Sequence, residues 1–166
     1  CSSLTSINIP DSVTSIGDYV FSYCSSLTSI IIPDSVTLIG EYAFYKCSSI
    51  TFVTIGNSVI SIDEYAFSDC YSLTSVTIGN SLTSIGNHAF SYCVSLTSIV
   101  VEDGNAVYDS RNNCNAIIET STDKLIVGCR NTIIPNNVTS IEDYAFYSCS
   151  GLTSIEIPNS VNSIGY

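Results

Sequence analysis

The chain repeats itself with a period of 23 residues, and this period constrains the fold more than any single motif does. Four consecutive units align without a gap: 4–26, 27–49, 50–72 and 73–95. Their apolar residues fall at the same positions, so each unit has an apolar side that only its neighbours can cover. The period therefore predicts a repeat solenoid, whose core grows along one axis and forms a single domain over 1–166.

Three further units continue the array: 96–128, 129–151 and the partial unit 152–166. We number the units 1 to 7 in chain order. Unit 5 is longer than the others and loses the pattern in its middle, but the register recovers in unit 6. Both ends of the sequence fall inside a unit, and neither shows the polar cap of terminal repeats, so we expect a piece of a longer array.

The first segment of each unit predicts a β-strand. In unit 1, Leu4, Ile7 and Ile9 align with apolar residues of the later units, and the end of the segment alternates between inward and outward residues. This alternation is the period of a strand, and strands stacked about 4.8 Å apart form a parallel sheet. Pro10 then ends the strand, because proline cannot donate a hydrogen bond to a neighbouring strand.

The second half of each unit predicts a short turn. The pattern G-[DE]-Y-[AV]-F-x-x-C follows an inward pair, Val13 and Ile16, and gives Val20, Phe21 and Cys24 the spacing of a helical or 3-10 turn that faces the core. An acidic column marks the start of this turn: Asp18, Glu41, Glu64 and Asp143. These carboxylates fit the unpaired N–H groups of their own turn, and a calcium ladder is the alternative.

Most of the cysteines belong to the repeat. Six of the eight share one repeat position: Cys1, Cys24, Cys47, Cys70, Cys93 and Cys149. We expect a ladder of buried free thiols, because free cysteine is a common core residue and parallel Cβ directions suit a disulfide poorly. Cys114 and Cys129 lie outside this column, and a bridge between them stays open. No cysteine or histidine pattern of a zinc site is present, so we expect no metal and no cofactor.

Composition excludes several classes of function. Fifteen acidic residues against four basic ones give a net charge of −11, which excludes nucleic acid and anionic membrane surfaces as partners. No apolar run reaches the roughly 18–20 residues needed to span a bilayer, so we expect no membrane insertion. The one histidine, His88, stands where other units have tyrosine, and nothing singles out a nucleophile or orients a base. We therefore predict no catalytic residue and no enzyme.

Unit 5 carries an insertion. Two apolar stretches, 116–119 and 124–127, flank the polar segment ETSTDK and predict a β-hairpin. Because the register recovers afterwards, we expect a loop-side elaboration of the solenoid, and such excursions often carry function in repeat proteins.

The motif LTSI.IPDSV.SIGDYAFS.C resembles the BspA-type leucine-rich repeats over essentially the whole chain. The inserted unit, with GNAVYDSRNNCNAIIET, is similar to a recurrent variant of that family. The resemblance implies a curved, right-handed leucine-rich-repeat array with a parallel β-sheet on one face and short helical or 3-10 turns on the other. It also implies secreted or cell-surface proteins that adhere to matrix proteins, host cells or other microbes. Proline or glycine follows the LxxIxI segment, so an asparagine ladder is not expected.

The outward strand positions are the candidate binding surface. They form two columns, Ser6, Ser29, Phe52, Ser75, Ser98 and Ser154, and Asn8, Ile31, Thr54, Thr77, Val100 and Glu156. Our candidate binding residues are Phe52, Ile31, Thr54, Thr77, Ser75 and Ser98. Phe52 is the first choice, because aromatic anchors dominate interfaces. Alternatively, Phe52 and Ile31 simply pack on each other.

Two functions follow from these features. The leading hypothesis is a non-catalytic module of a secreted or cell-surface protein that binds a protein or a glycan, with host matrix among the partners, through the sheet face and the 101–128 excursion. The alternative is a structural spacer, or an array that associates end to end, because open strand edges are templates for pairing.

Overall fold

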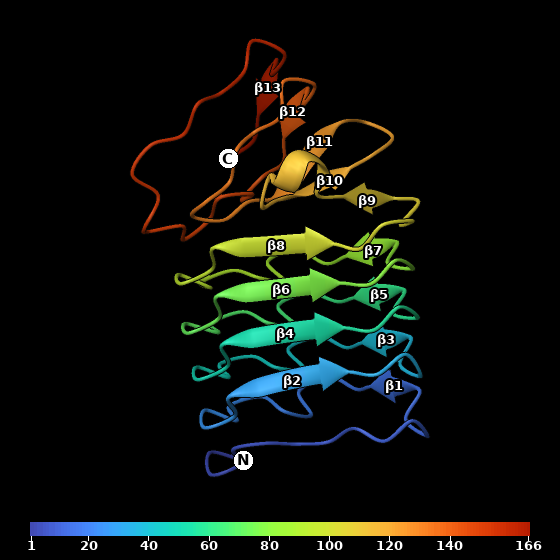
Figure 1. Cartoon of the computed structure of the whole chain (residues 1–166). Coiled ribbons are helices and arrows are strands. Elements are labelled where there is room, and N and C mark those ends of the chain that lie inside the picture. The colour runs from blue at the N-terminus through green and yellow to red at the C-terminus, as the bar shows by residue number, and fades with distance from the viewer.

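The computed structural model describes residues 1–166 and forms a parallel β-solenoid that rises from the N-terminus to the C-terminus (Figure 1). Four strands stack in one parallel sheet: β2 (Ser29–Ile32), β4 (Phe52–Ile55), β6 (Ser75–Ile78) and β8 (Ser98–Val101). Four shorter strands stack in a second: β1 (Ser15–Ile16), β3 (Leu38–Ile39), β5 (Ser61–Ile62) and β7 (Ser84–Ile85). The predicted solenoid is confirmed.

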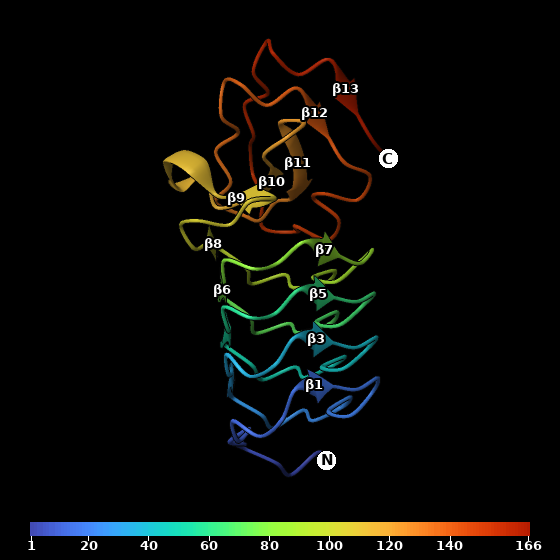
Figure 2. The same cartoon turned by 90° about the vertical axis from the view of Figure 1, so that its right-hand side faces the viewer.

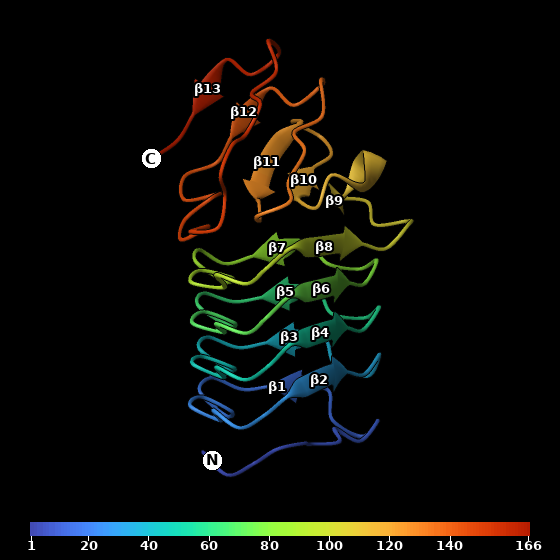
Figure 3. The ribbon, with the colours of Figure 1, turned by 60° about the vertical axis from the view of Figure 1, so that its left-hand side comes forward.

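The strands pair in the register that the repeat predicts. Ile30 of β2 lies opposite Val53 of β4, which lies opposite Val76 of β6. These inward residues are buried, as are those of β3 and β5 on the second sheet. Figure 3 shows the two sheets side by side, and Figure 2 shows the sheet of β2 to β8 on the side opposite the turns that follow β1, β3, β5 and β7.

The turn segments also contribute to the core. Phe44 and Phe67 are fully buried and stack with their ring centroids 5.1 Å apart, and Phe90 continues the stack. Val20 of unit 1 was expected to face inward, but it is half exposed, whereas Ala43 at the same position of unit 2 is buried. Val20 has a neighbouring turn on one side only, in unit 2, whereas Ala43 lies between the turns of units 1 and 3.

The turns are not helical, which corrects the expected helical or 3-10 turn. In unit 1, Tyr19 and Tyr23 have φ values of 58° and 60°, in the left-handed region, and later units repeat this at the same positions. The N–H groups of Tyr19, Phe21 and Tyr23 donate to carbonyl oxygens of unit 2 and not to their own turn. Phenylalanine and cysteine three residues apart suit this paired turn as well as a helix, so the spacing could not distinguish the two.

The cysteine column holds free thiols with one exception. The thiols of Cys47, Cys70 and Cys93 each donate to the carbonyl oxygen of the phenylalanine in the preceding unit, over 3.1 to 3.4 Å. Cys1 and Cys24 form a disulfide, which corrects the expected free thiols at this step of the ladder. Their Cα atoms are 4.7 Å apart, within the range that a disulfide requires, because adjacent units stack closely.

Unit 5 begins a third sheet. Its strands, in spatial order from the C-terminal end, are β13 (Ser163–Ile164), β12 (Ser140–Ile141), β11 (Lys124–Val127), β10 (Ile117–Glu119) and β9 (Tyr108–Asp109). A short 3-10 helix, η1 (Arg111–Asn113), lies between β9 and β10. The antiparallel pair β10 and β11 is the predicted hairpin, and β11 continues into the parallel strands of units 6 and 7.

The hairpin is part of the core, which corrects the expectation of a loop-side elaboration. Ile117, Ile118 and Leu125 are fully buried, and the last two belong to a second apolar cluster that the hairpin builds with unit 6. Cys114 and Cys129 are both buried and free, and each donates to a nearby carbonyl oxygen. The bridge that was left open between them is not formed.

The long strand is missing from units 1, 6 and 7, although the sequence predicts it in unit 1 at Leu4 to Ile9. Where the next strand would pair with β8, the N–H of Ile133 donates instead to the carbonyl oxygen of Cys114 in the insertion. β8 is therefore the last strand of its sheet, and four members of the expected outward columns lie outside any strand: Ser6, Asn8, Ser154 and Glu156.

Candidate binding face and the tyrosine columns

The sheet face brings together the six candidate residues. Phe52 pairs with Ser75, and Ser75 with Ser98, in one column, while Ile31, Thr54 and Thr77 form the other. Phe52 is 43% exposed and Ile31 is 64% exposed. The two lie diagonally across β2 and β4, a separation of about 7–8 Å that an aromatic side chain can bridge. We call this surface, formed by the outward residues of β2, β4, β6 and β8, the sheet face.

Hydroxyl groups on the sheet face make no hydrogen bond within the chain, whereas those just before the strands do. The hydroxyls of Thr51, Thr74 and Thr97 each donate to the carbonyl oxygen of the threonine in the preceding unit. By contrast, the hydroxyls of Thr54 and Thr77 have no hydrogen-bond partner in the chain. The solenoid therefore uses one threonine column for its own structure and leaves the next one free.

The turn side carries a column of stacked rings. Its members come from one repeat position: Tyr19, Tyr42, Tyr65, His88 and Tyr144. Neighbouring ring centroids lie 4.7 to 5.0 Å apart, and the rings are stacked except at the last step, where the planes of His88 and Tyr144 are tilted by 46°. His88 stands in for tyrosine in this column, as the sequence predicts. It bridges unit 4 to unit 6, because unit 5 has no turn.

A second column runs beside the first, at the end of each turn. It contains Tyr23, Lys46, Asp69 and Tyr92. The Lys46 ammonium nitrogen lies 5.4 Å from the ring centroid of Tyr23 and 5.1 Å from that of Tyr45, within the range of a cation–π contact. Hydrogen bonding to the Tyr45 hydroxyl, followed by the charge interaction with the Tyr23 phenol group, raises the pKa of Lys46 above its ordinary value.

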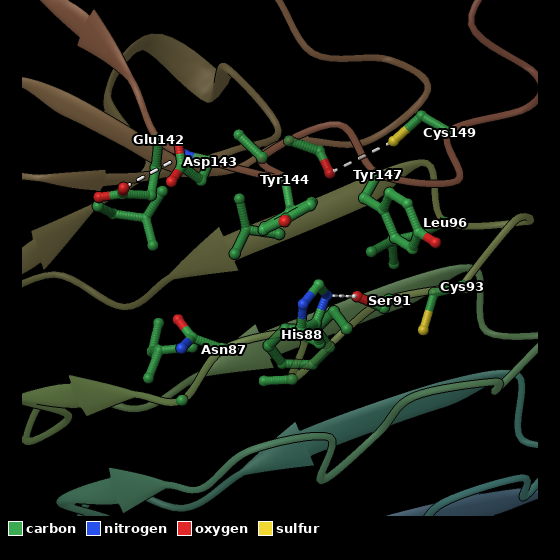
Figure 4. Close-up of a pocket in the computed structure, with 18 residues that line it drawn as sticks. Asn87, His88, Ser91, Cys93, Leu96, Glu142, Asp143, Tyr144, Tyr147 and Cys149 are labelled. Atoms are coloured by element: carbon green, nitrogen blue, oxygen red, sulfur yellow. Dashed lines mark hydrogen bonds between the residues drawn. The ribbon is translucent and has the colours of Figure 1, made fainter. Parts of the chain in front are cut away.

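The turn of unit 6 packs against that of unit 4 across a small cavity of about 80 Å³ (Figure 4). His88 and Ser91 reach it from unit 4, and Tyr144 and Tyr147 from unit 6. The hydrogen-bond ladder of the turns is broken here, because the N–H groups of His88, Phe90 and Tyr92 have no acceptor in the chain. Contact between units 4 and 6 therefore rests on their side chains.

Gly128 explains the break. Its N–H donates to the carbonyl oxygen of Ala145, the acceptor that the repeat assigns to Phe90, and its own carbonyl oxygen accepts the Cys149 thiol. A Cβ atom here would lie 2.2 Å from the Phe146 ring, so only glycine fits without a shift of that ring. The insertion thus takes over one rung of the ladder between units 4 and 6.

The acidic column acts between units. A carboxylate oxygen of Asp18 accepts the N–H of Glu41 in unit 2, and Asp143 accepts the N–H of Tyr166 in unit 7. This corrects the expected bond to the N–H groups of their own turn. The chain holds no cluster of three or more His, Cys, Asp or Glu side chains that could bind a metal ion, which argues against the calcium ladder.

The imidazole of His88 has a single hydrogen-bond partner. Its Nδ1 lies 3.0 Å from the Ser91 hydroxyl, and no carboxylate contacts the ring. A general base needs such an orienting group, so the geometry provides no catalytic triad.

All four basic side chains are engaged within the chain. Arg111 pairs with Asp109 and Asp123, and Lys124 pairs with Glu142. Arg130 donates to the Gly151 carbonyl oxygen, and Lys46 lies on its two tyrosine rings. Most carboxylates are thus left without a basic partner. No helix here has the length and apolar character of a membrane span.

Sequence reasoning missed two side-chain ladders. Asp34 accepts the N–H of Asn57, and Asn57 accepts the N–H of Asn80, so a short side-chain ladder does exist where none was expected. The stacking of the tyrosine column was also missed. Its signal was an aromatic residue at one position of every complete turn.

Three solved structures place this fold among bacterial repeat proteins. The pneumococcal vaccine antigen PcpA matches with a TM-score of 0.79 and 24% identity, over 92% of this chain and 39% of that one. A leucine rich cell surface protein from Faecalibacterium prausnitzii matches with a TM-score of 0.64 and 33% identity, over 99% of this chain and 52% of that one. A leucine rich repeat protein of T. pallidum matches with a TM-score of 0.55 and 23% identity, over 97% and 73%.

The chain spans about two fifths of PcpA and about half of the F. prausnitzii protein. No curated protein matches its sequence. Six copies of the model for the BspA type leucine rich repeat region match residues 1–118 and 125–166. With that sequence match and a solenoid of the same architecture, the chain belongs to the BspA-type leucine-rich repeat family.

Proposed function

We propose that the chain is a non-catalytic, adhesion-type binding module of a secreted or cell-surface protein, and that its sheet face holds a protein or a glycan. The observation that carries this proposal is the set of unused hydroxyls on the sheet face around an exposed apolar pair. Thr54 and Thr77 are free to bond a ligand, and Phe52 and Ile31 supply the apolar contact. An aromatic side chain that a partner covers fully is a common source of binding energy.

The relatives support a location outside the cell. The F. prausnitzii structure is named a cell surface protein, and PcpA is named a vaccine antigen. The sheet face also carries no charge over β2 to β8, so a ligand there pays no desolvation cost for buried ions. Neutral polar surfaces of proteins and glycans suit such a face. The hairpin strands of unit 5 are buried and support the fold, so the proposed site is the sheet face.

A binding screen tests the proposal. Immobilised matrix glycoproteins, serum proteins and glycans are probed with the chain, with and without calcium, and each hit is repeated with Phe52→Ala. A hot-spot residue should cost about tenfold or more in affinity. Ile60→Ala is the matched control, because Ile60 is 49% exposed and lies just before β5, away from the sheet face.

Equal binding by both variants would remove Phe52 from the site. Silence across the panel from a folded, monomeric chain would favour the structural spacer. Filaments that lengthen with concentration would instead favour end-to-end association through strand edges.

A further inference from the structure

Two places on the turn side carry the same pair of tyrosine rings. In the first, Tyr23 of unit 1 meets Tyr45 of unit 2 edge to face, with centroids 5.5 Å apart and planes at 88°. In the second, Tyr92 of unit 4 meets Tyr147 of unit 6, at 5.2 Å and 76°. The rings occupy the same two repeat positions in both pairs, because unit 6 packs directly on the turn of unit 4.

The first pair holds a cation and the second does not. Lys46 places its ammonium group against Tyr23 and Tyr45. The residue at the position of Lys46 in the second pair is Ser148, and the two share a left-handed backbone, with φ values of 57° and 64°. The second pair thus has the same rings and backbone but lacks the ammonium group.

We propose that the Tyr92–Tyr147 pair binds an ammonium or guanidinium group from outside, carried by a lysine or arginine side chain of a basic polypeptide segment. Both rings are more than 40% exposed, so a partner can reach them. Tyr147 lies at the rim of the cavity between units 4 and 6 (Figure 4). The hydroxyls of the two tyrosines lie 2.9 Å apart, which fixes the rings relative to each other.

A carboxylate next to the pair strengthens the attraction for a cation. Asp69 precedes Tyr92 in the same column and follows Lys46. The hydroxyls of Tyr71 and Ser68 donate to its carboxylate at 2.5 Å and 3.3 Å and hold it in place. The hydrogen bond with Tyr147 is the main cause that raises the pKa of Tyr92, and the negative charge of Asp69 raises it further. The same charge also raises the pKa of Lys46.

The charge balance of the whole chain favours this partner. The four basic side chains are already engaged, so none is free to fill the second pair. A net charge of −11 attracts a basic segment over a distance and speeds its association. The site is separate from the sheet face, so its partner can bind independently of the ligand proposed there.

The test fills the site from within. Ser148→Lys should place an ammonium group on Tyr92 and Tyr147 as Lys46 does on its own pair, and so exclude an external one. The probe is an acetylated, amidated tetralysine peptide at low salt, followed by calorimetry and by NMR of the tyrosine rings. We expect Ser148→Lys to weaken binding by about two- to fivefold, the usual size of one exposed cation–π contact.

Two control variants separate site occupancy from charge. Ser150→Lys adds the same charge at an exposed position two residues away, and Ser148→Gln changes the site without a charge. Both should bind the peptide more tightly than Ser148→Lys does. Equal weakening by the two lysine variants would overturn the proposal, because it would show an effect of net charge alone.

Three further arms sharpen the result. A tetra(acetyl-lysine) peptide should not bind, and equal binding by it would also overturn the proposal. Butylammonium should shift the ring signals of Tyr92 and Tyr147 in the original chain but not in Ser148→Lys, which shows that the cation itself is recognised. Lys46→Ser should open the first pair and raise the number of butylammonium sites from one to two, and an unchanged number would contradict the equivalence of the two pairs.

Discussion

The two long sides of the solenoid come from the same repeat but differ in what their exposed side chains do. On the sheet face, the side chains of Phe52, Thr54 and Thr77 point away from the core and make no hydrogen bond within the chain. On the turn side, Tyr42 stacks on the rings of both neighbouring units, and the N–H beneath it donates to unit 3. The exposed side chains of the sheet face thus have no structural role, whereas those of the turn side link each unit to the next.

This difference teaches where a repeat protein can vary. A substitution on the sheet face changes only the surface, whereas one in the turn breaks a contact with a neighbouring unit. Binding specificity can therefore change on the sheet face at little cost in stability. On the turn side, the proposed cation site lies between units 4 and 6, where the ladder of backbone hydrogen bonds is broken.

The largest effect should come from the interior of the turn side. Phe67→Ala should lower the free energy of unfolding by about 3–5 kcal/mol, because it removes a fully buried ring between Phe44 and Phe90 and leaves a cavity. Phe52→Ala on the sheet face should cost less than about 1 kcal/mol, since that ring is 43% exposed. Urea unfolding of both variants measures the difference, and similar losses would contradict the contrast between the two sides.

A pH effect should also arise beneath the turns. Burial raises the pKa of Cys47 to about 11 and that of Cys93 to about 12, whereas an unfolded thiol titrates near about 8.5. The unfolded chain loses these protons first, so the thiols contribute their full stability below about pH 8.5 and lose it as pH rises toward the folded values. Unfolding free energies measured from pH 8 to 11 should fall.

Iodoacetamide labelling isolates the thiols from the tyrosines in this experiment. At pH 8, Cys47 and Cys93 should label at least about a hundredfold more slowly in the folded chain than in urea. Equal rates would show that these thiols are accessible to solvent and that the cysteine column is not buried.

A substitution at the junction between the insertion of unit 5 and unit 6 should have a smaller effect on stability. Gly128→Ala should cost about 1–3 kcal/mol, because its Cβ would meet the Phe146 ring and push unit 6 away from the insertion. Gly17→Ala is the control, since a Cβ at Gly17 meets nothing within 4 Å. A cost for Gly17→Ala as large as that for Gly128→Ala would point to backbone entropy or solvation in place of the clash.

Much of the fold was predictable from the sequence, and the features that were missed have a physical explanation. The 23-residue period placed Ile30, Val53 and Val76 in the core, because inward residues of stacked strands must be apolar. The hairpin of unit 5 was also predicted, from two apolar stretches that flank a polar segment. The disulfide at Cys1 and the left-handed tyrosines were missed, because a periodic pattern gives spacing but not backbone conformation or oxidation state.

The loss of the long strand after β8 was hidden for a different reason. Ile134 keeps the inward position of the earlier strands and is buried, but the N–H of Ile133 donates to the carbonyl oxygen of Cys114 and not to β8. A long-range competitor from the insertion decides this pairing, and no local signal reports it.

The smallest expected difference in stability is between substitutions of two threonines in unit 4. Thr74→Val removes a hydroxyl that donates to the Thr51 carbonyl oxygen at 2.8 Å, and should cost about 0.5–1.5 kcal/mol. Thr77→Val removes a hydroxyl with no partner in the chain, and should leave stability nearly unchanged while lowering affinity for a ligand of the sheet face. If Thr77→Val destabilised the fold as much as Thr74→Val does, the sheet face would share the structural role of the turn side. The Thr77 hydroxyl would then not be free to bind a ligand.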